Sequence, residues 1–239
     1  MIAARQISKS YSKLSVYSDF ELTLRDGCIT TILGRSGFGK TTLLNLIAGV
    51  ELPDSGEIKF PQQYTVGYLL QENILLPWRT LRQNIQLSTE VMGKKARAPD
   101  TRVDELLHRF GLEGFEDYYP DALSGGMKQR AALIRSLIIE PTLILLDEPF
   151  SNLDFDIKLK IQQEIISYQK EIKATVIIVT HDIEDAIALS DEVIVLSGKP
   201  ATVKATIPID LSGSGKDPVL ARKSSRFPMY FSRIWEELK

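Results

Sequence analysis

The stretch that decides the fold runs from Cys28 to Ala48 and reads CITTILGRSGFGKTTLLNLIA. Its first six residues are apolar or β-branched and predict a buried strand, and residues 41–48 predict a helix that ends at Gly49. The turn between them, Gly34 to Thr41, matches the pattern G-x-x-x-x-G-K-[ST]. Glycines in such a turn let successive backbone N–H groups converge on phosphate oxygens, and the helix N-terminus adds its dipole. The sequence therefore predicts a phosphate-binding loop.

The residues of this loop have defined places in the predicted site. Lys40 is expected to reach the β- and γ-phosphates of a nucleotide, and the Thr41 hydroxyl is expected to bind Mg²⁺. The predicted nucleotide-binding set in this stretch consists of Gly34, Arg35, Ser36, Gly37, Phe38, Gly39, Lys40, Thr41 and Thr42. The alternative is an ordinary glycine-rich turn, and the strand and helix on either side argue against it. The pattern predicts bound phosphate groups together with Mg²⁺.

A second stretch, Leu143 to Glu148, places two carboxylates at the end of a hydrophobic run. In open α/β sheets, ligands bind at the edge formed by the carboxyl ends of the strands. Asp147 is expected to hold Mg²⁺ through water, and Glu148 to polarise the water that attacks the γ-phosphoryl group. The alternative is a core strand that runs out into an acidic turn. Together with the phosphate loop, the two carboxylates favour in-line transfer of a γ-phosphoryl group to water.

Strand-like and helix-like stretches alternate along the chain, which predicts an α/β fold with a P-loop NTPase core and a mainly parallel sheet. Residues 1–57 hold short strands and turns, which we interpret as an antiparallel β part. Residues 73–122 are polar and helix-prone, with the clearest amphipathic helix at Thr101 to Phe110, and predict an inserted helical subdomain. Further strands are expected at 143–146, 176–180 and 192–196, and further helices at 156–170 and 183–189.

These expectations divide a single domain, residues 1–239, into three parts. Residues 1–72 and 140–211 form the nucleotide-binding core. Residues 73–139 form the helical subdomain, and residues 212–239 form a short tail. Within the tail, Ser212 to Gly215 is interpreted as a flexible joint.

Composition excludes several other classes of protein. Hydrophobic residues make up 44% and charged residues 25% of the chain, which is typical of a globular protein and not of a disordered one. The net charge of -2 gives no electrostatic footprint for nucleic acid. The single cysteine, Cys28, cannot form an internal disulfide and fits a reducing, cytoplasmic setting. The longest apolar runs fall far short of the roughly 20 residues that span a bilayer.

A third stretch, Leu123 to Met127, reads LSGGM and precedes apolar residues at helical spacing. With the phosphate loop and the carboxylates in order around it, the chain resembles the nucleotide-binding subunits of ABC transporters, whose signature reads LSGGQ or close to it. The resemblance implies that Ser124, Gly125 and Gly126 cap the γ-phosphate of ATP held by a second copy of the chain. Met127 and Phe38 depart from the usual residues and leave the phosphate-binding glycines intact.

The resemblance also implies roles for four residues outside these motifs. Gln71 senses Mg²⁺ and the attacking water, His181 contacts the γ-phosphate, and Tyr11 stacks on adenine. Asp154 belongs to a loop, residues 151–154, that communicates across the dimer. Each has a plainer alternative when taken alone: a surface amide, a packed or capping histidine, a strand-surface tyrosine and a helix N-cap. The expected catalytic set is thus Glu148, His181 and Gln71, and the expected metal set is Thr41, Gln71 and Asp147.

Two further features resemble ABC importers of the nitrate, sulfonate and taurine type: residues 71–78, QENILLPW, and residues 119–127, YPDALSGGM. That resemblance implies uptake of a small solute through separate integral membrane permease subunits, with a solute-binding protein outside and this chain peripheral on the cytoplasmic face. Trp78 is expected either to help line a groove for a permease helix or to pack within the helical subdomain. The alternatives are an exporter subunit and an ABC ATPase clamp on nucleic acid or the ribosome, although the coiled coils, zinc insertions or tandem halves of such clamps are absent from the sequence.

Overall fold

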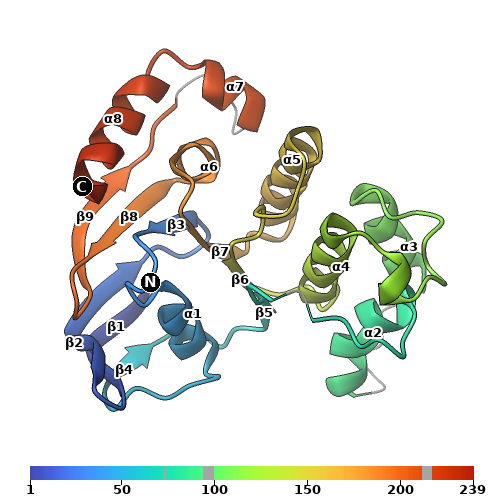
Figure 1. The fold of residues 1–239 in the computed structure, drawn as a ribbon, viewed down its shortest axis with the longest axis horizontal. Helices are drawn as coiled ribbons and strands as arrows, with labels where there is room; N and C mark the ends of the chain where they lie inside the picture. The colour runs from blue at the N-terminus through green and yellow to red at the C-terminus, as the bar shows by residue number, and fades with distance from the viewer. Residues whose placement is uncertain (73, 94–99, 212–216) are drawn as a thin grey trace. The chain divides into compact units, whose positions relative to one another are not determined.

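The computed structural model describes residues 1–72, 74–93, 100–211 and 217–239 (Figure 1). These residues form two compact units, one made of Met1–Gln63 with Lys173–Lys239 and the other of Tyr64–Ile172. None of the helices within the described ranges has the length and apolar character that crossing a bilayer requires. The expected joint at Ser212 to Gly215 lies outside the described residues.

The first unit contains a parallel sheet built on strand β3 (Ile29–Leu33). β3 pairs in parallel with β7 (Thr175–Thr180) on one side and with β8 (Glu192–Ser197) on the other. β9 (Thr202–Pro208) adds an antiparallel edge to β8. Every residue of β3 and β7 is buried, as expected for strands that are covered on both faces. The predicted strands at 28–33, 176–180 and 192–196 are therefore confirmed to within a residue or two.

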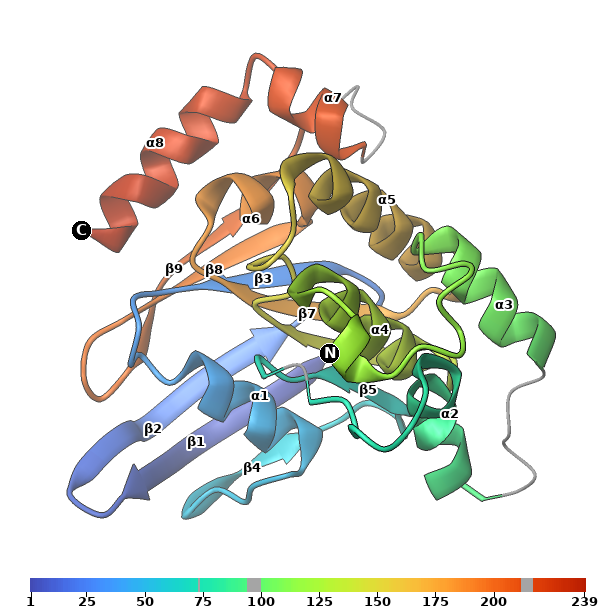
Figure 2. The same ribbon diagram turned by 45° about the vertical axis from the view of Figure 1, so that its right-hand side comes forward.

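The same unit contains a smaller antiparallel sheet, in the order β2, β1, β4 (Figure 2). β1 spans Ile2–Tyr11, β2 spans Leu14–Leu24 and β4 spans Ser55–Lys59. The antiparallel N-terminal part is confirmed, but its first two strands are long, not short as predicted. Their pairing has register shifts, and Gln6 and Asp19 take positive φ angles of 51°. Such irregularities interrupt the period-2 alternation by which a long strand is recognised in a sequence.

The helices of this unit begin with α1 (Lys40–Ala48), which ends at Gly49 as predicted. Gly49 has φ 71° and its N–H bonds back to the last turn of the helix, the usual glycine C-cap. α6 (Ile183–Leu189) also matches its prediction. The expected tail contains two further helices, α7 (Pro218–Lys223) and α8 (Phe227–Leu238). α8 joins the core through Phe227, Tyr230 and Ile234, which pack in one cluster with residues of α6, β8 and β9.

The second unit joins two parallel strands, β5 (Val66–Leu69) and β6 (Leu143–Asp147), to a set of helices. The helices are α2 (Leu81–Val91), α3 (Asp100–Arg109), α4 (Gly125–Leu137) and α5 (Phe155–Ile172), with a 3-10 turn, η2, at Pro120–Ala122. A Cβ on Gly67 would lie 2.3 Å from the carbonyl oxygen of Ser136, so β5 lies directly against α4. Helices α2 and α3 confirm that the inserted segment is helical, while the proposed boundaries of the three parts remain a prediction.

An ion pair between α6 and α7 gives a test of how firmly the tail belongs to the core. Arg222 Nη2 lies 2.9 Å from Asp185 Oδ1, with side chains only 15% and 3% exposed. Arg222→Met removes the cation beside a buried carboxylate and should lower the free energy of unfolding by about 3 kcal/mol in denaturant titration. The control is Arg226→Met, because Arg226 pairs with Asp210 at 2.8 Å with both side chains at least half exposed, and about 0–1 kcal/mol is expected. Equal losses in both variants would contradict the prediction.

Candidate functional site

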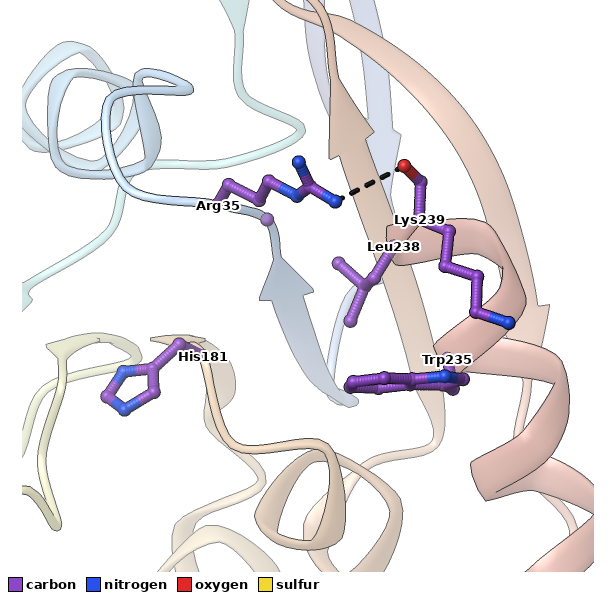
Figure 3. Close-up of a pocket in the computed structure, with 6 residues that line it drawn as sticks. Arg35, His181, Trp235, Leu238 and Lys239 are labelled. Carbon is purple, nitrogen blue, oxygen red and sulfur yellow. Dashed lines mark hydrogen bonds between the residues drawn. The ribbon is translucent and has the colours of Figure 1, made fainter.

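The phosphate loop and His181 lie at the same edge of the parallel sheet of the first unit. Leu33, the last residue of β3, is paired in register with Thr180 of β7 and with Val195 of β8. The loop starts at the next residue after Leu33, and His181 is the next residue after Thr180. Figure 3 shows His181 and Arg35 on the same side of the sheet, at the ends of their strands. The structure thus brings together two elements that the sequence analysis connected only through resemblance.

The ammonium group of Lys40 is held against the loop that precedes it. Lys40 Nζ donates to the carbonyl oxygen of Gly34 at 2.8 Å and to that of Arg35 at 3.2 Å. Backbone carbonyls are neutral acceptors, whereas phosphate oxygens are anionic and attract the ammonium group more strongly. We therefore propose that Lys40 exchanges one or both carbonyl contacts for phosphate oxygens when ATP binds.

Gly39 is required by the local geometry at the end of the loop. Its φ of 79° is in the left-handed region, and a Cβ there would lie 2.6 Å from Val16 Cγ1 and 2.8 Å from the Tyr17 hydroxyl. The hydroxyl of Tyr17 donates to the carbonyl oxygen of Gly39 at 2.8 Å, and burial raises the pKa of this tyrosine. The loop is therefore fastened to strand β2, a contact that the sequence analysis missed because nothing in the local pattern connects residues 22 positions apart.

Tyr11, the proposed adenine-stacking residue, lies at the end of β1 with 42% of its surface exposed. Its hydroxyl donates to the carboxylate of Glu51, and Lys9 Nζ lies 5.3 Å from the centroid of its ring. Burial, followed by this hydrogen bond, raises the pKa of Tyr11 above its ordinary value. The hydrogen bond from Tyr11 is also the main cause that lowers the pKa of Glu51. The ring is fixed at its hydroxyl end and part of its surface is exposed, which suits stacking; the role stays a proposal.

In the second unit, Gln71, Asp147 and Glu148 follow two paired strands. Leu69 of β5 is in register with Leu146 of β6, so Gln71 and Glu148 each lie two residues beyond a paired position at the same edge. Asp147 is almost fully buried at the end of β6, while Gln71 is exposed in a bend. Glu148 takes a φ of 49°, a conformation that costs a non-glycine residue about 1–3 kcal/mol and is concentrated at functional sites. The predicted amide and carboxylates therefore share one edge of this strand pair.

The signature residues form the N-terminus of α4. Ser124 is the N-cap, and its hydroxyl accepts from the backbone N–H of Met127 at 3.3 Å. Ser124 and Gly125 are exposed, and no atom lies within 4 Å of a Cβ built on Gly125. A cavity of about 250 Å³ is bounded by Ser124, Gly126 and Asp154, among others. The signature and the 151–154 loop, both expected at a dimer interface, thus line one cavity.

The donor groups proposed for Mg²⁺ fit that ion when its usual coordination is considered. Within the described ranges, no group of three or more His, Cys, Asp or Glu side chains could hold a metal by itself. Mg²⁺ bound with a nucleotide takes one or two carboxylates, and phosphates and water complete its oxygen shell. Thr41 of the first unit supplies a hydroxyl oxygen, and within the second unit Asp147 supplies a buried carboxylate and Gln71 an amide oxygen. Each of these is a donor type that suits Mg²⁺.

The tail contributes residues beside the phosphate loop that the sequence analysis did not include. Trp235, Leu238 and Lys239 line a cavity of about 240 Å³ together with Gly34, Arg35 and His181 (Figure 3). Arg35 Nη2 donates to the carbonyl oxygen of Lys239 at 3.2 Å. The apolar spacing of Phe227, Tyr230 and Ile234 is the signal for the helix that carries these residues. Its position beside the loop cannot be read from that spacing.

Comparison with known proteins gives this arrangement its family. The family described as ABC transporter matches residues 17–151. The formylaminopyrimidine import ATP-binding protein ThiZ of Halalkalibacterium halodurans is 39% identical over 88% of this chain and 86% of its own length. The aliphatic sulfonates import ATP-binding protein SsuB 1 of Pseudomonas savastanoi is 39% identical over 90% of this chain and 89% of its own length. A dimeric post-hydrolysis structure of the ATP-binding cassette MJ0796, bound to ADP and Pi, superimposes with a TM-score of 0.81 at 28% identity over 88% of this chain and 99% of that one.

A glycine-rich loop between a central parallel strand and a helix is the arrangement of the P-loop NTPase fold. The chain belongs to the ABC transporter family and is an ATP-binding and ATP-hydrolysing member of it. The resemblance and the fold class predicted from the sequence are confirmed. The roles of individual residues remain proposals, among them the binding of phosphate by Lys40.

Replacing Lys40 by alanine should weaken MgATP binding about 100-fold while the fold survives, because the phosphates lose a charge-assisted donor worth about 3 kcal/mol. Calorimetric titration measures the affinity, and thermal unfolding of the same sample monitors the fold. Lys59→Ala is the matched control, since Lys59 is an exposed lysine on β4 that pairs with Glu57. Undiminished affinity in Lys40→Ala would show that the phosphate site is wrongly assigned.

Proposed function

We propose that this chain is the ATPase subunit of an ABC importer. It binds MgATP, pairs with a second copy of itself, and drives uptake of a small solute through separate integral membrane permease subunits. Its place is peripheral, on the cytoplasmic face of the membrane, and a solute-binding protein delivers the solute. The observation that supports this proposal is that one chain holds two helix starts suited to phosphate, the glycine-rich loop before α1 on the first unit and the start of α4 on the second.

The start of α4 has the properties of a site for a phosphate brought by another molecule. A helix N-terminus offers unpaired N–H groups and the positive end of the helix dipole. Here the first residues, Ser124 and Gly125, are exposed and open, which suits a ligand that arrives from outside. If each copy supplies one loop and one signature helix to each ATP, the assembly is isologous and has twofold symmetry. The dimeric state of the cassette MJ0796 supports this arrangement.

The chemistry we propose divides the site residues by role. Lys40 and the loop N–H groups bind the phosphates, and Ser124 to Gly126 of the second copy close the site over the γ-phosphate. Glu148 orients and deprotonates the attacking water, with Gln71 and His181 aligning the water and the γ-phosphate. Thr41, Gln71 and Asp147 are the residues that would hold Mg²⁺, which would supply charge stabilisation when bound together with ATP. Tyr11 stacks on the adenine, worth on the order of 1 kcal/mol.

Import and the class of solute rest on the relatives and on two sequence stretches. The relatives ThiZ and SsuB 1 are named as import ATP-binding proteins, for formylaminopyrimidine and aliphatic sulfonates. Residues 71–78 and 119–127 resemble the nitrate, sulfonate and taurine group of importers. We therefore propose a small solute of this kind. The direct test is to purify the complex from membranes, identify the co-purifying subunits, and find the solute that stimulates ATP hydrolysis.

Glu148→Gln should leave MgATP binding intact and lower the hydrolysis rate about 100-fold or more, since the amide keeps the shape of the side chain but cannot accept the proton of water. ATP should then remain bound between two copies of the chain. Sedimentation velocity of the variant with and without MgATP measures the dimer, with Glu164→Gln on α5 as a charge-matched control that should hydrolyse normally. A Glu148→Gln chain that stays monomeric at high concentration with saturating MgATP would count against the composite site.

Trp78 is held on the surface by a rigid turn. The indole is 71% exposed, so the alternative that it packs within the helical subdomain does not hold. The side chain of Asn84, fully buried, accepts from the N–H of Leu76 and donates to the carbonyl oxygens of Leu76, Arg79 and Thr80 at 3.0–3.1 Å. A large aromatic side chain that is exposed and presented by a fixed backbone is typical of an anchor for a partner. We propose that it contacts a short helix of the permease.

Replacing Trp78 by alanine should preserve ATP binding by the isolated chain but weaken its association with the permease subunits, because an aromatic anchor contributes about 2 kcal/mol or more. Co-purification from membranes measures the association, and solute uptake per ATP hydrolysed measures coupling. Val91→Ala serves as the control, since Val91 is also exposed in this unit, at the end of α2. A folded Trp78→Ala variant with parental co-purification and uptake would overturn the proposed contact.

A further inference from the structure

A buried glutamine connects the signature helix to the loop that carries the proposed base. Gln129 lies on α4, five residues after the N-cap Ser124, and only 2% of its surface is exposed. Its Nε2 donates to the carbonyl oxygen of Glu148 at 3.1 Å, and its Oε1 accepts from the backbone N–H of Asn152 at 3.2 Å. One amide thus holds the backbone at both ends of the turn that leads from Glu148 into the 151–154 loop.

From this geometry we infer that Gln129 is a positioning residue for hydrolysis, an inference that rests on the function proposed above. It acts by fixing the backbone of Glu148 and of the 151–154 loop relative to the start of α4. It does not contact ATP. Its effect is on the direction in which the Glu148 side chain leaves the backbone.

The backbone of Glu148 needs such support. A φ of 49° is unfavourable for a residue with a side chain, and such conformations persist only where surrounding contacts over-determine them. The carbonyl oxygen of Glu148 accepts two side-chain donors, the amide of Gln129 and the hydroxyl of Ser151 at 3.2 Å. Ser151 is exposed, whereas Gln129 is buried, and a hydrogen bond shielded from water holds its geometry more strongly.

Asn152, the second residue that the Gln129 amide contacts, lies against the signature itself. A Cβ on Gly126 would lie 3.2 Å from the carbonyl oxygen of Asn152, so the loop packs directly against the first turn of α4. Gln129 binds the N–H of this same Asn152 from the next turn. Because a helix moves as a rigid element, displacement of its N-terminus on meeting a phosphate would be transmitted through Gln129 to Glu148. Contact between the signature and the nucleotide of the second copy would thus change the position of Glu148 in the chain that carries the signature.

A purely structural role for Gln129 makes a different prediction. A buried amide that only satisfies backbone groups would lower stability when removed, and ATP affinity and turnover would follow the loss of folded protein. A positioning role lowers kcat while the affinity for ATP and the ATP-driven dimer are retained. A misplacement of about 1 Å costs as much as ~100-fold in rate. The split between kcat and binding therefore separates the two roles.

Two variants of Gln129 carry the test. Gln129→Met keeps the volume and removes both hydrogen bonds, and Gln129→Glu keeps the acceptor for Asn152 but replaces the donor to Glu148. Both should lower kcat of the full complex about 10- to 100-fold, with the Kd of MgATP within about twofold of the parent. Gln169→Met, which removes another buried amide, on α5, is the control and should retain parental kcat. Parental kcat in either Gln129 variant, or a parallel loss of affinity, would overturn the inference.

A second measurement keeps this inference separate from the proposed function. Gln129→Glu is combined with Glu148→Gln, and the MgATP-dependent dimer is followed by sedimentation. The double variant should dimerise as well as Glu148→Gln alone. If Glu148→Gln alone fails to dimerise, the composite site is wrong. If only the double variant fails, the composite site stands, and Gln129 is needed for assembly, contrary to the inference.

Discussion

Backbone pairing around β3 determines where the chemistry of the first unit lies. Parallel strands place all their carboxyl ends at one edge, and here Leu33 is in register with Thr180 and Val195. Residues that directly follow these strands are therefore neighbours, although Gly34 and His181 are far apart in the chain. Both faces of β3 and β7 are buried, so a slip of one residue would exchange the side chains between two packed faces and disrupt the packing on both. This pairing determines where the phosphate loop begins, and the hydrogen bond from the Tyr17 hydroxyl to the carbonyl oxygen of Gly39 holds the end of the loop.

Much of this could be predicted from the sequence because the decisive signals are local. Every residue from Cys28 to Leu33 is apolar or β-branched, the loop has its glycines and lysine at fixed spacing, and Gly49 ends the helix, so one strand–loop–helix unit follows. The same holds for the strand that ends in Asp147 and for Ser124 as the cap of α4. Each of these stretches contains its own evidence for its conformation.

The remaining contacts could not be predicted, because the groups that interact are far apart in the sequence or are backbone groups that every residue type carries. The amide of Gln129 binds two backbone groups, 19 and 23 residues away, and any residue type could supply them. Long strands β1 and β2 are hidden by irregularities at Gln6 and Asp19. Helix α8 has visible spacing, but its approach to the phosphate loop depends on packing with β8 and β9.

The proposed function gives one explanation for the exposed side chain of Trp78, the open start of α4 and the unfavourable backbone conformation of Glu148 in the second unit. Isolated proteins generally cover large apolar side chains and avoid unfavourable φ angles, and a helix N-terminus that is open to solvent leaves N–H groups available to a ligand. Trp78 is mostly exposed, the start of α4 is open at Gly125, and Glu148 is held at φ 49° by contacts from elsewhere in the unit. A chain that works only when a second copy and a permease contact it needs such features, since groups satisfied within the monomer would gain nothing from assembly. Binding of these partners can then favour one conformation of the site over another, which is the thermodynamic condition for coupling ATP hydrolysis to transport.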